Sequence, residues 1–539
     1  MTHLAVAIMV QSLDQALAAA ARAAELGADL VEFRIDQFTS DPESLTQLVE
    51  GSALPCIITC RPTWEGGSFE GDDLARFTLL EKIGPGVRQP AYVDVELAAY
   101  QRSPKVRATV ARLVDHPGQV RRTTTGLILS SHDFEGRPID LYQRIEAMTA
   151  STACRVMKVA WLARSLRDNI EAFEILEQHH KPTIALCMGE SGLPSRILAK
   201  KFSALLTFAS LDAESGTAPG QPTVQEFKDL YRWDSINAES RVYGVIGYPV
   251  AHSMSPAIHN AGFDQLNHNG VYLPMPIPRE YEHFKATVLS WLQMPALHFS
   301  GASVTIPHKE NLLRFVHEAG GQVEELADRI GAANTLTRRG DGAGNGLYAS
   351  NTDYAAALEA VCTALNCAPD ELRDQRVAVI GAGGAARAVA AGFAHHGATI
   401  VIYNRTFAKA ESLAKRIRAT VADDSGAKIT PARMEKLCDS CCEIYINCTP
   451  IGMHPNIDAS PIDITKPRGW GPGTVVFDTI YNPVETRLLR QARDGGCLVI
   501  SGIEMFVRQA GAQFKLWTGQ AAPLDVFRRV LMEKLQQAP

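Results

Sequence analysis

Two basic side chains, one within an apolar run and one just after another, are suited to carbonyl chemistry in the first half of the chain. Lys158 lies inside the run 155–160, and His132 follows the run 126–130. An apolar setting disfavours the ammonium form of a lysine, and the neutral amine is the form that attacks a ketone to give an imine. Alone, each is more simply explained as a snorkelling lysine or a loop histidine. Together they favour Schiff-base catalysis, with His132 as the proton shuttle.

Polar side chains end several other apolar runs of the same half. Glu32, Arg34 and Asp36 alternate along the chain, so they share one face of a strand. The arginines of the set supply charge for an anionic substrate. The full set is Glu32, Arg34, Asp36, Arg61, Glu65, Asp94, Glu96, Asp133 and Arg196.

These side chains need a scaffold that brings many strand ends together. Apolar runs alternate with helix-like segments over roughly 220 residues, which is the pattern of a (β/α)8 TIM barrel, an α/β fold with its chemistry at the carboxyl ends of the strands. We expect strands at 4–10, 30–35, 56–60, 92–97, 126–130, 155–160, 183–188 and 205–211.

The same motifs resemble type I 3-dehydroquinate dehydratase over about residues 1–225. The resemblance is carried by Glu32-Phe33-Arg34-Ile35-Asp36, Cys60-Arg61, Glu65-Gly66-Gly67, Ser131-His132-Asp133-Phe134, Lys158, Arg196 and Ala218-Pro219-Gly220-Gln221. It implies an imine at Lys158, proton transfer by His132, and orientation of the histidine or substrate by Glu65 and Glu32. It also implies that substrate is held by Arg34, Arg61, Arg196, Thr217 and Gln221. Thr217 stands where the family more often has serine.

A glycine-rich turn in the second half indicates a dinucleotide site. Gly381, Gly383 and Ala386 fill a G-x-G-x-x-A pattern between an apolar run at 377–380 and an Ala-rich helix, and a second strand is expected at 399–403. Such a turn lets a pyrophosphate approach backbone N–H groups at a helix N-terminus.

The residues after that second strand favour NADP over NAD. An NAD site usually offers a carboxylate to the ribose hydroxyls there, whereas this chain has Asn404, Arg405 and Thr406. A guanidinium with two small polar side chains suits a phosphate dianion.

A lysine and an aspartate lie at two further strand ends. Lys309 would begin one helix and Asp353 another. Lys309 alone could be a solvated first-turn residue, and Asn351 or Asp353 a helix N-cap. Beside a reduced nicotinamide, Lys309 and Asp353 would instead form a proton-delivery pair for a ketone that receives hydride. The hydroxyls of Ser253 and Ser255 either cap a helix or bind a carboxylate.

From about residue 241 to the end, the chain resembles shikimate dehydrogenase. The motifs are Ser253-Met254-Ser255-Pro256, Val304-Thr305-Ile306-Pro307-His308-Lys309, Ala333-Asn334-Thr335, Asn351-Thr352-Asp353, the glycine turn, Asn404-Arg405-Thr406, Asn447-Cys448-Thr449-Pro450 and Asp478-Thr479-Ile480-Tyr481-Asn482-Pro483. The resemblance implies a catalytic pair of Lys309 and Asp353. It implies shikimate contacts from Ser253, Ser255, Thr305, Asn334, Asp353, Tyr481 and Gln509, and cofactor contacts from Gly381, Ala382, Gly383, Gly384, Ala385, Asn404, Arg405, Thr406, Thr449, Met453 and Gly502.

Two departures from the shikimate dehydrogenase pattern concern the substrate pocket. Ser303 replaces an asparagine that is common in single-domain bacterial members, and Ala349-Ser350 replaces pairs that contain glycine. The serine resembles the fused plant-type enzymes. We expect a slightly altered pocket with the chemistry retained.

The motifs divide the chain into a barrel followed by a two-lobe unit with a Rossmann lobe. We expect the dehydratase barrel at 1–225, a linker at 226–240, the substrate-binding lobe at 241–370, the NADP-binding lobe at 371–502, and C-terminal helices at 503–539 that pack back on the substrate lobe.

Composition limits the partners. The net charge of −6 provides no basic field for nucleic acid, and no apolar run approaches membrane-spanning length. The start of the chain shows no targeting leader, so we expect a cytoplasmic protein. Of eleven cysteines, Cys438, Cys441 and Cys442 form a cluster, but no second Cys or His pair accompanies them at zinc spacing, so we expect no metal.

The two halves of the chain are suited to consecutive reactions on one cyclic substrate. The first would eliminate water from 3-dehydroquinate to give 3-dehydroshikimate, and the second would reduce that ketone to shikimate with NADPH, on the route to chorismate and the aromatic amino acids. One alternative is a quinate dehydrogenase in the second half, although Ser253 and Ser255 favour shikimate. Another is a ligand-sensing regulator without turnover, against which Lys158, His132, Lys309 and Asp353 are all present.

Overall fold

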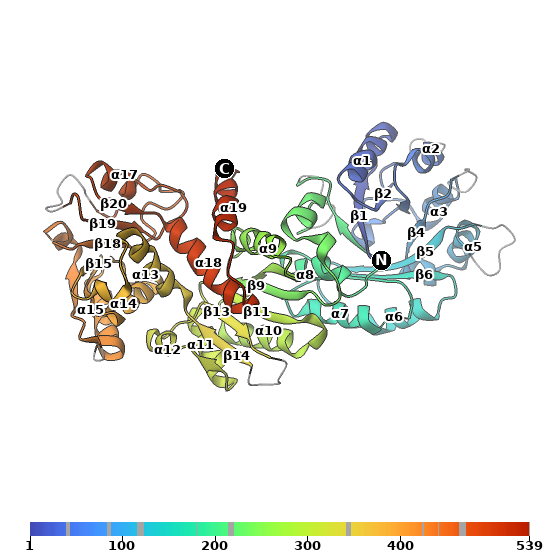
Figure 1. The fold of residues 1–539 in the computed structure, drawn as a ribbon. Coiled ribbons are helices and arrows are strands. Elements are labelled where there is room, and N and C mark those ends of the chain that lie inside the picture. Colours follow the sequence, from blue (N-terminus) through green and yellow to red (C-terminus); the bar gives the residue numbers. More distant parts are fainter. Residues whose placement is uncertain are drawn as a thin grey trace. The chain divides into compact units, whose positions relative to one another are not determined.

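The computed structural model describes residues 1–38, 44–82, 88–115, 123–178, 180–213, 220–340, 346–422, 425–439, 441–462 and 470–537. The chain forms two compact units (Figure 1). The first consists of Met1–Arg241, Asn269–Ile277 and Thr287–His298, and the second of Val242–His268, Pro278–Ala286 and Phe299–Pro539.

The first unit contains the expected barrel of parallel strands. The eight strands follow the order β7-β6-β5-β4-β3-β2-β1-β8. A backbone hydrogen bond of 2.9 Å from Leu205 N to Thr183 O brings the two outer strands of this ladder together, so the ring is nearly closed. The strands are β1 (His3–Met9), β2 (Leu30–Arg34), β3 (Cys56–Thr59), β4 (Tyr92–Glu96), β5 (Gly126–Asp133), β6 (Cys154–Leu162), β7 (Thr183–Met188) and β8 (Leu206–Ala209).

Helices separate the barrel strands, and short polar residues start several of them. Ser12 and Asp72 accept hydrogen bonds from the first turns of α1 and α3, and Ser103 does so for α5, which begins with Pro104. The helices are α1 (Leu13–Glu25), α2 (Ser44–Gly51), α3 (Asp73–Glu81), α4 (Leu97–Arg102), α5 (Pro104–Leu113), α6 (Leu141–Ala150), α7 (Asp168–Gln178) and α8 (Leu193–Ile197).

An apolar layer fills the barrel interior, because alternate strand residues point inward. Its buried members lie on seven strands and include Ala5, Ile57, Ile128, Val156 and Ile184. The inward polar residues come later in their strands, as Thr59 and His132 do, so they lie toward the carboxyl end of the barrel.

The segment expected as a linker is bonded to the barrel. Lys200 Nζ donates to the carbonyls of Trp233 (3.2 Å) and Asp234 (3.0 Å), and Lys201 Nζ donates to Ala238 O (2.5 Å). The segment also forms two short helical turns, Glu226–Leu230 and Trp233–Ser235. It is therefore a packed element of the first unit and not a free connection.

One sheet of the second unit is mixed. Strand β11 is parallel to β9 and antiparallel to β13. Strand β13 pairs antiparallel with β14, and β14 pairs parallel with β12. The elements of this part of the chain are β9 (Arg241–Gly247), α9 (Ser255–Gln265), β10 (Gly270–Pro276), α10 (Tyr281–Gln293), β11 (Phe299–Val304), α11 (Lys309–Glu318), β12 (Gln322–Val323), α12 (Glu325–Ile330), β13 (Thr335–Arg338), β14 (Leu347–Ser350) and α13 (Thr352–Leu365).

The other sheet of the second unit is parallel and has the Rossmann arrangement. Its strand order is β17-β16-β15-β18-β19-β20. Successive strands are therefore added to one side of β15 as far as β17 and to its other side from β18 on, which is the Rossmann order. Its elements are β15 (Arg376–Ile380), α14 (Gly384–His395), β16 (Thr399–Asn404), α15 (Phe407–Ile417), β17 (Ile429–Arg433), β18 (Ile444–Asn447), β19 (Val475–Asp478), α17 (Arg487–Asp494) and β20 (Leu498–Ile500).

The last two helices return to the mixed sheet and its helices. Helix α18 (Gly502–Thr518) packs against α13, β11 and β13, and α19 (Leu524–Gln537) packs against α9. Trp517 Nε1 donates to Leu336 O at 2.9 Å, which ties α18 to β13. Among the described residues, no helix is both long and apolar enough to cross a membrane.

Candidate active sites

The register of the barrel places the predicted lysine and histidine on one face. Ser130 of β5 lies opposite Lys158 of β6, and His132 lies opposite Ala160. Residues two apart in a strand point the same way, so Ser130, His132 and Lys158 all point into the barrel. Lys158 is buried, with 4% of its surface exposed.

The surroundings of Lys158 differ from the apolar cleft expected from its neighbours in sequence. Its Nζ donates to Asp94 Oδ2 at 2.8 Å and lies 3.5 Å from Glu32 Oε1. The ring of Phe208 lies 4.7 Å from Nζ and is its apolar contact. The expectation was wrong because Met157 and Val159, the immediate neighbours of Lys158, point to the other face of the strand, while its charged partners come from β2 and β4.

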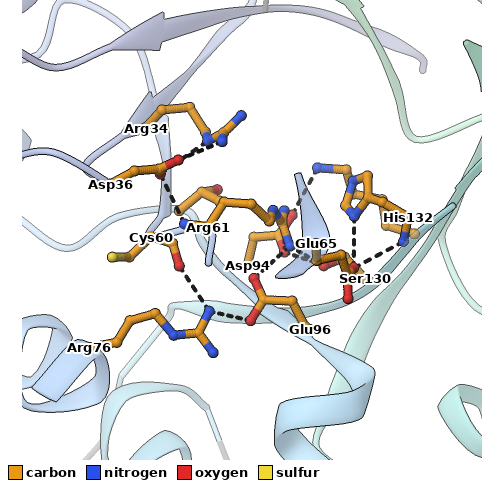
Figure 2. Close-up of polar contacts among 12 residues, drawn as sticks. Arg34, Asp36, Cys60, Arg61, Glu65, Arg76, Asp94, Glu96, Ser130 and His132 are labelled. Carbon is orange, nitrogen blue, oxygen red and sulfur yellow. Dashed lines mark hydrogen bonds and ion pairs between the residues drawn. The ribbon is translucent and has the colours of Figure 1, made fainter. Parts of the chain in front are cut away.

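Arg61 connects these carboxylates into a buried network (Figure 2). Its Nη1 donates to Glu96 Oε1 and to Ser130 Oγ, both at 2.7 Å, and its Nη2 lies 2.9 Å from Asp94 Oδ1. Burial alone would raise the pKa of Asp94, but the charges of Arg61 and Lys158 outweigh it and hold the pKa well below its usual range. Asp94 is therefore a permanent anion beside the lysine.

The carboxyl group of Glu65 contacts both the ring and the backbone of His132 (Figure 2). Its Oε1 lies 2.9 Å from His132 Nδ1 and accepts a 2.9 Å hydrogen bond from the backbone nitrogen of that residue. Burial lowers the pKa of His132 well below its usual 6.5, and the charges of Arg61 and Lys158 lower it further. At neutral pH the imidazole is uncharged and can accept a proton.

The other predicted barrel residues differ in their burial and in their bonding partners. Glu32 is buried and accepts a 2.6 Å hydrogen bond from Thr59 Oγ1. Arg34 forms a salt bridge of 2.6 Å with Asp36. Gln221 follows β8 and is half-buried. Thr217 lies outside the described residues.

Arg196 differs from the other arginines of the barrel. It is 2% exposed, it forms no ion pair with a described acid, and its Nε has no hydrogen-bond partner among the described residues. Burial lowers the pKa of its guanidinium to about 10. A buried cation of this kind is suited to an anionic ligand.

Sequence reasoning left several members of the network out of the predicted site. Asp94 and Glu96 were recognised as strand-end acids but received no role. Their alternation in β4 was the available signal, since it puts both on the inward face. Arg76 gave no signal, because it lies on α3 and reaches Glu96 and Cys60 O only in the folded barrel (Figure 2).

In the second unit, the predicted lysine and aspartate are in contact. Lys309 Nζ lies 2.5 Å from Asp353 Oδ2. Asn334 Nδ2 donates to Asp353 Oδ1 at 3.0 Å, and its own Oδ1 accepts from Thr352 N at 2.8 Å. Asn351 caps α13, since its side chain accepts from Asp353 N. The carboxylate is therefore oriented from both of its oxygens.

Two groups of predicted substrate residues lie apart from this pair in the chain. Ser253 Oγ accepts a 3.3 Å hydrogen bond from Ser255 N, ahead of α9, which has no side-chain cap. The rings of Tyr481 and Phe506 lie 4.8 Å apart, and Gln509 Nε2 donates to Phe506 O at 3.2 Å. Thr305 is half-buried at the end of β11.

The glycine turn has room for a pyrophosphate. Gly381 has a φ of +120°, which favours glycine, and a Cβ there would lie 3.0 Å from Cys448 O. A Cβ on Gly383 or Gly384 would meet no atom within 4 Å, so the start of α14 faces open space. The exposed N–H groups of this helix start fit a phosphate. Ala382 and Ala385 are half-buried in the same turn.

The end of β16 carries the residues predicted to select the cofactor. Asn404 is half-buried and Arg405 and Thr406 are exposed, and Asn404 Nδ2 donates to Thr406 O at 2.9 Å. Among the described residues, no acid pairs with Arg405. The end of this strand therefore presents one positive charge and one hydroxyl group to solvent.

Thr449, Met453 and Gly502 have distinct environments. Thr449 Oγ1 donates to Asn447 Oδ1 at 2.7 Å, and Met453 is 46% exposed. A Cβ on Gly502 would lie 2.3 Å from Ile480 O. The close approach of the Ile480 backbone by itself explains a glycine at 502, and the predicted cofactor contact stays a prediction.

The departures and the cysteine cluster have structural settings of their own. Ser303 Oγ donates to Gln513 Oε1 at 2.8 Å, so the serine is bonded to α18. Ala349 and Ser350 are buried in β14. Cys442 is buried and Cys441 is exposed, while the side chain of Cys438 lies outside the described part. No group of metal-binding side chains occurs among the described residues.

Four family models match the chain in the order of its parts. Type I 3-dehydroquinase matches residues 4–238, the shikimate dehydrogenase substrate binding domain 245–336, shikimate / quinate 5-dehydrogenase 364–434, and the shikimate 5'-dehydrogenase C-terminal domain 502–532. Together with the barrel and the Rossmann sheet, these matches define a lyase fused to an oxidoreductase of the shikimate pathway.

Similar proteins cover either nearly the whole chain or about half of it. The bifunctional 3-dehydroquinate dehydratase/shikimate dehydrogenase, chloroplastic, of Arabidopsis thaliana is 36% identical over 97% of this chain and 83% of its own. A shikimate dehydrogenase (NADP(+)) of Methanosarcina mazei is 40% identical over 55% of this chain and 99% of its own. A solved dehydroquinate dehydratase and shikimate dehydrogenase from S. pombe is 26% identical over 98% of each chain, with a TM-score of 0.43. This chain belongs to the family of bifunctional 3-dehydroquinate dehydratase/shikimate dehydrogenases.

Proposed function

We propose that the barrel dehydrates 3-dehydroquinate through an imine at Lys158. The shared inward face of Ser130, His132 and Lys158 supports this most, because it sets an amine and an uncharged imidazole above one apolar layer. Lys158 Nζ attacks the ring ketone and water leaves. His132 then takes a proton from the adjacent carbon, and the hydroxyl on the next carbon departs as water with a proton that His132 returns. Another water hydrolyses the imine, which releases the product ketone and restores the Lys158 amine.

The charged residues of the barrel hold the substrate. Arg196 binds the carboxylate, since it is a buried cation without an acidic partner in the described part of the chain. Arg34 and Arg61, with Gln221 and Thr217, take the ring hydroxyls, and Glu32 and Glu65 orient the substrate and the histidine.

The second unit reduces 3-dehydroshikimate to shikimate. The 2.5 Å contact between Lys309 Nζ and Asp353 Oδ2 supports proton delivery to the ketone oxygen. Ser253 and Ser255 bind the substrate carboxylate. The remaining substrate contacts come from Thr305, Asn334, Tyr481 and Gln509.

The cofactor of this unit is NADP(H), which supplies the hydride when it is bound. The open glycine turn of Gly381–Ala385 takes the pyrophosphate, and Arg405 with Asn404 and Thr406 takes the ribose phosphate. Thr449, Met453 and Gly502 border the nicotinamide. The parts are the barrel at 1–225, a connecting segment at 226–240, a substrate lobe at 241–370, a cofactor lobe at 371–502 and C-terminal helices at 503–539.

Trapping with borohydride tests the barrel mechanism. Reduction in the presence of 3-dehydroquinate should attach the ring to Lys158, as seen by mass spectrometry of peptides. The Lys158→Ala variant should lose both the adduct and dehydration, while its reduction of 3-dehydroshikimate persists. Normal dehydration by Lys158→Ala would refute the imine.

Variants of the ion pair test the reductase mechanism. Lys309→Met should lower kcat by about 10²–10⁴-fold, the usual value of a positioned proton donor. Its binding of NADPH, followed by fluorescence titration, should stay unchanged. Oxidation of shikimate and of quinate, each with NADP and with NAD, decides between shikimate and quinate dehydrogenase activity.

A further inference from the structure

Strand β17 places an arginine beside the residues that select the cofactor. It runs parallel to β16, and the register sets Arg433 opposite Asn404. Both residues end their strands. Arg433 therefore lies at the carboxyl end of the sheet, as do Asn404 and the Arg405 that follows it, although it is distant from them in sequence.

An aromatic ring holds the Arg433 side chain. Its guanidinium carbon lies 4.9 Å from the ring centre of Phe407, the first residue of α15. Stacking of this kind stabilises an exposed guanidinium and restricts its orientation. The contact keeps the charge over the short connection from β16 to α15, which contains Arg405 and Thr406.

The cations around this connection have no acidic partners in the part of the chain that the structure describes. Arg433, Arg405 and Lys409 are all exposed and form no ion pair there. Two other arginines of the same unit are neutralised: Arg387 binds Glu310 at 2.8 Å, and Arg508 binds Glu359 at 2.5 Å. Unpaired positive charge gathered at one strand edge is suited to a compact dianion.

We propose that Arg433 is a further specificity-determining residue of the dehydrogenase, which binds the 2′-phosphate of the NADP(H) adenosine together with Arg405. The inference rests on the proposed use of NADP(H). A planar guanidinium donates two parallel hydrogen bonds to a phosphate, and it gains much less from the ribose hydroxyl that NAD(H) has at this place. Arg433 thus favours NADP(H) over NAD(H).

Calorimetric titration with 2′,5′-ADP and with 5′-AMP tests the contact without turnover. The two probes differ by the phosphate in question. Arg433→Met should weaken 2′,5′-ADP binding by roughly 10–100-fold, the value of one or two charge-assisted hydrogen bonds, and leave 5′-AMP binding unchanged. The KM for NADPH should rise while the KM for NADH and for shikimate stay constant. Phe407→Leu, which removes the ring and keeps the arginine, should give a smaller loss of the same kind.

Arg418→Met is the matched control. Arg418 contacts the other end of β17, where its Nε donates to Ile429 O at 3.0 Å, so its loss should not affect 2′,5′-ADP. Native 2′,5′-ADP affinity in Arg433→Met, alongside a native protein that prefers 2′,5′-ADP to 5′-AMP, would overturn the role of Arg433 alone. A native protein without that preference would contradict the NADP(H) assignment, and the inference with it.

Discussion

Glu65 Oε1 lies 2.9 Å from His132 Nδ1 and 2.9 Å from the backbone nitrogen of the same residue. One carboxyl group therefore fixes both the ring and the backbone of the histidine. Gly66, with a left-handed φ of +77°, turns the chain directly after Glu65. Burial raises the pKa of Glu65 to about 8 and lowers the pKa of His132, so the pair is largely uncharged at neutral pH.

Dehydration should persist in mildly acidic solution. The base works only when His132 is unprotonated, and a lowered pKa extends that form to lower pH. The acid limb of kcat/KM should therefore lie below pH 6.5, the usual pKa of histidine. Initial rates followed by absorbance of the enone across the acidic range measure it. An acid limb at or above that value would contradict the assignment.

Replacement of Glu65 by its neutral isostere should be mild below pH 8 and more harmful above it. Glu65 is mainly protonated below its pKa of about 8, and Glu65→Gln keeps an acceptor oxygen for the His132 backbone. Glu65→Ala removes that oxygen and should lose far more activity. Profiles of kcat against pH for both variants make the comparison, and equal losses at neutral pH would refute the role of the hydrogen bond.

Removal of the Asn334 amide should slow ketone reduction. Asn334 donates to Asp353 Oδ1 at 3.0 Å, and a misplaced catalytic group costs about 10²-fold in rate. Asn334→Ala should lower kcat by this order and destabilise the fold by about 1–3 kcal/mol. Asn311→Ala is the control, because Asn311 lies on α11 near Lys309 and its amide contacts His308. Equal kcat values in the two variants would count against the prediction.

Loss of Arg76 should weaken the barrel site through Glu96. Arg76 is 1% exposed and donates to Glu96 and to Cys60 O. Arg76→Met should cost about 3–5 kcal/mol, as expected for breaking a buried ion pair, and raise the KM for 3-dehydroquinate as Glu96 and Arg61 shift. Denaturant unfolding and steady-state kinetics measure both.

Arg102→Met provides the comparison for Arg76. Arg102 pairs with Asp73 at 2.5 Å, and Arg76 pairs with the same carboxylate at 3.0 Å. The Arg102 side chain is 56% exposed, so its loss should cost under about 1 kcal/mol. Similar stability of the two variants would rule out the burial argument. If Arg76→Met does not fold, Glu96→Gln tests the same link through KM.

Two glycines of the second unit should separate stability from cofactor binding. A Cβ on Gly502 would lie 2.3 Å from Ile480 O, so Gly502→Ala should destabilise the unit by about 1–3 kcal/mol or more. A Cβ on Gly384 meets no atom within 4 Å, so Gly384→Ala should keep its stability and weaken NADPH binding. Thermal unfolding and fluorescence titration of both variants test this, and the reverse pattern would disprove it.

Sequence alone was sufficient for the elements and the family. The strand and helix periods predicted the eight barrel strands and the Rossmann turn, because alternation and glycine spacing are local properties of the chain. The motifs around Lys158 and Lys309 were sufficient to predict both enzyme families, which the family models bear out. The pattern of runs also predicted that His132 and Lys158 lie on adjacent strands, and the register of β5 and β6 then places them on one face.

Tertiary structure decided what surrounds each of these residues. Asp94 binds Lys158 across 64 positions of sequence, Glu96 binds Arg76 from a helix, and Asn334 binds Asp353 between two strand ends. Arg433 reaches Asn404 only through the register of two parallel strands. Such contacts depend on strand order and register, which long-range packing sets. The periodicity of a single segment therefore suggested an apolar cleft where the folded barrel has carboxylates.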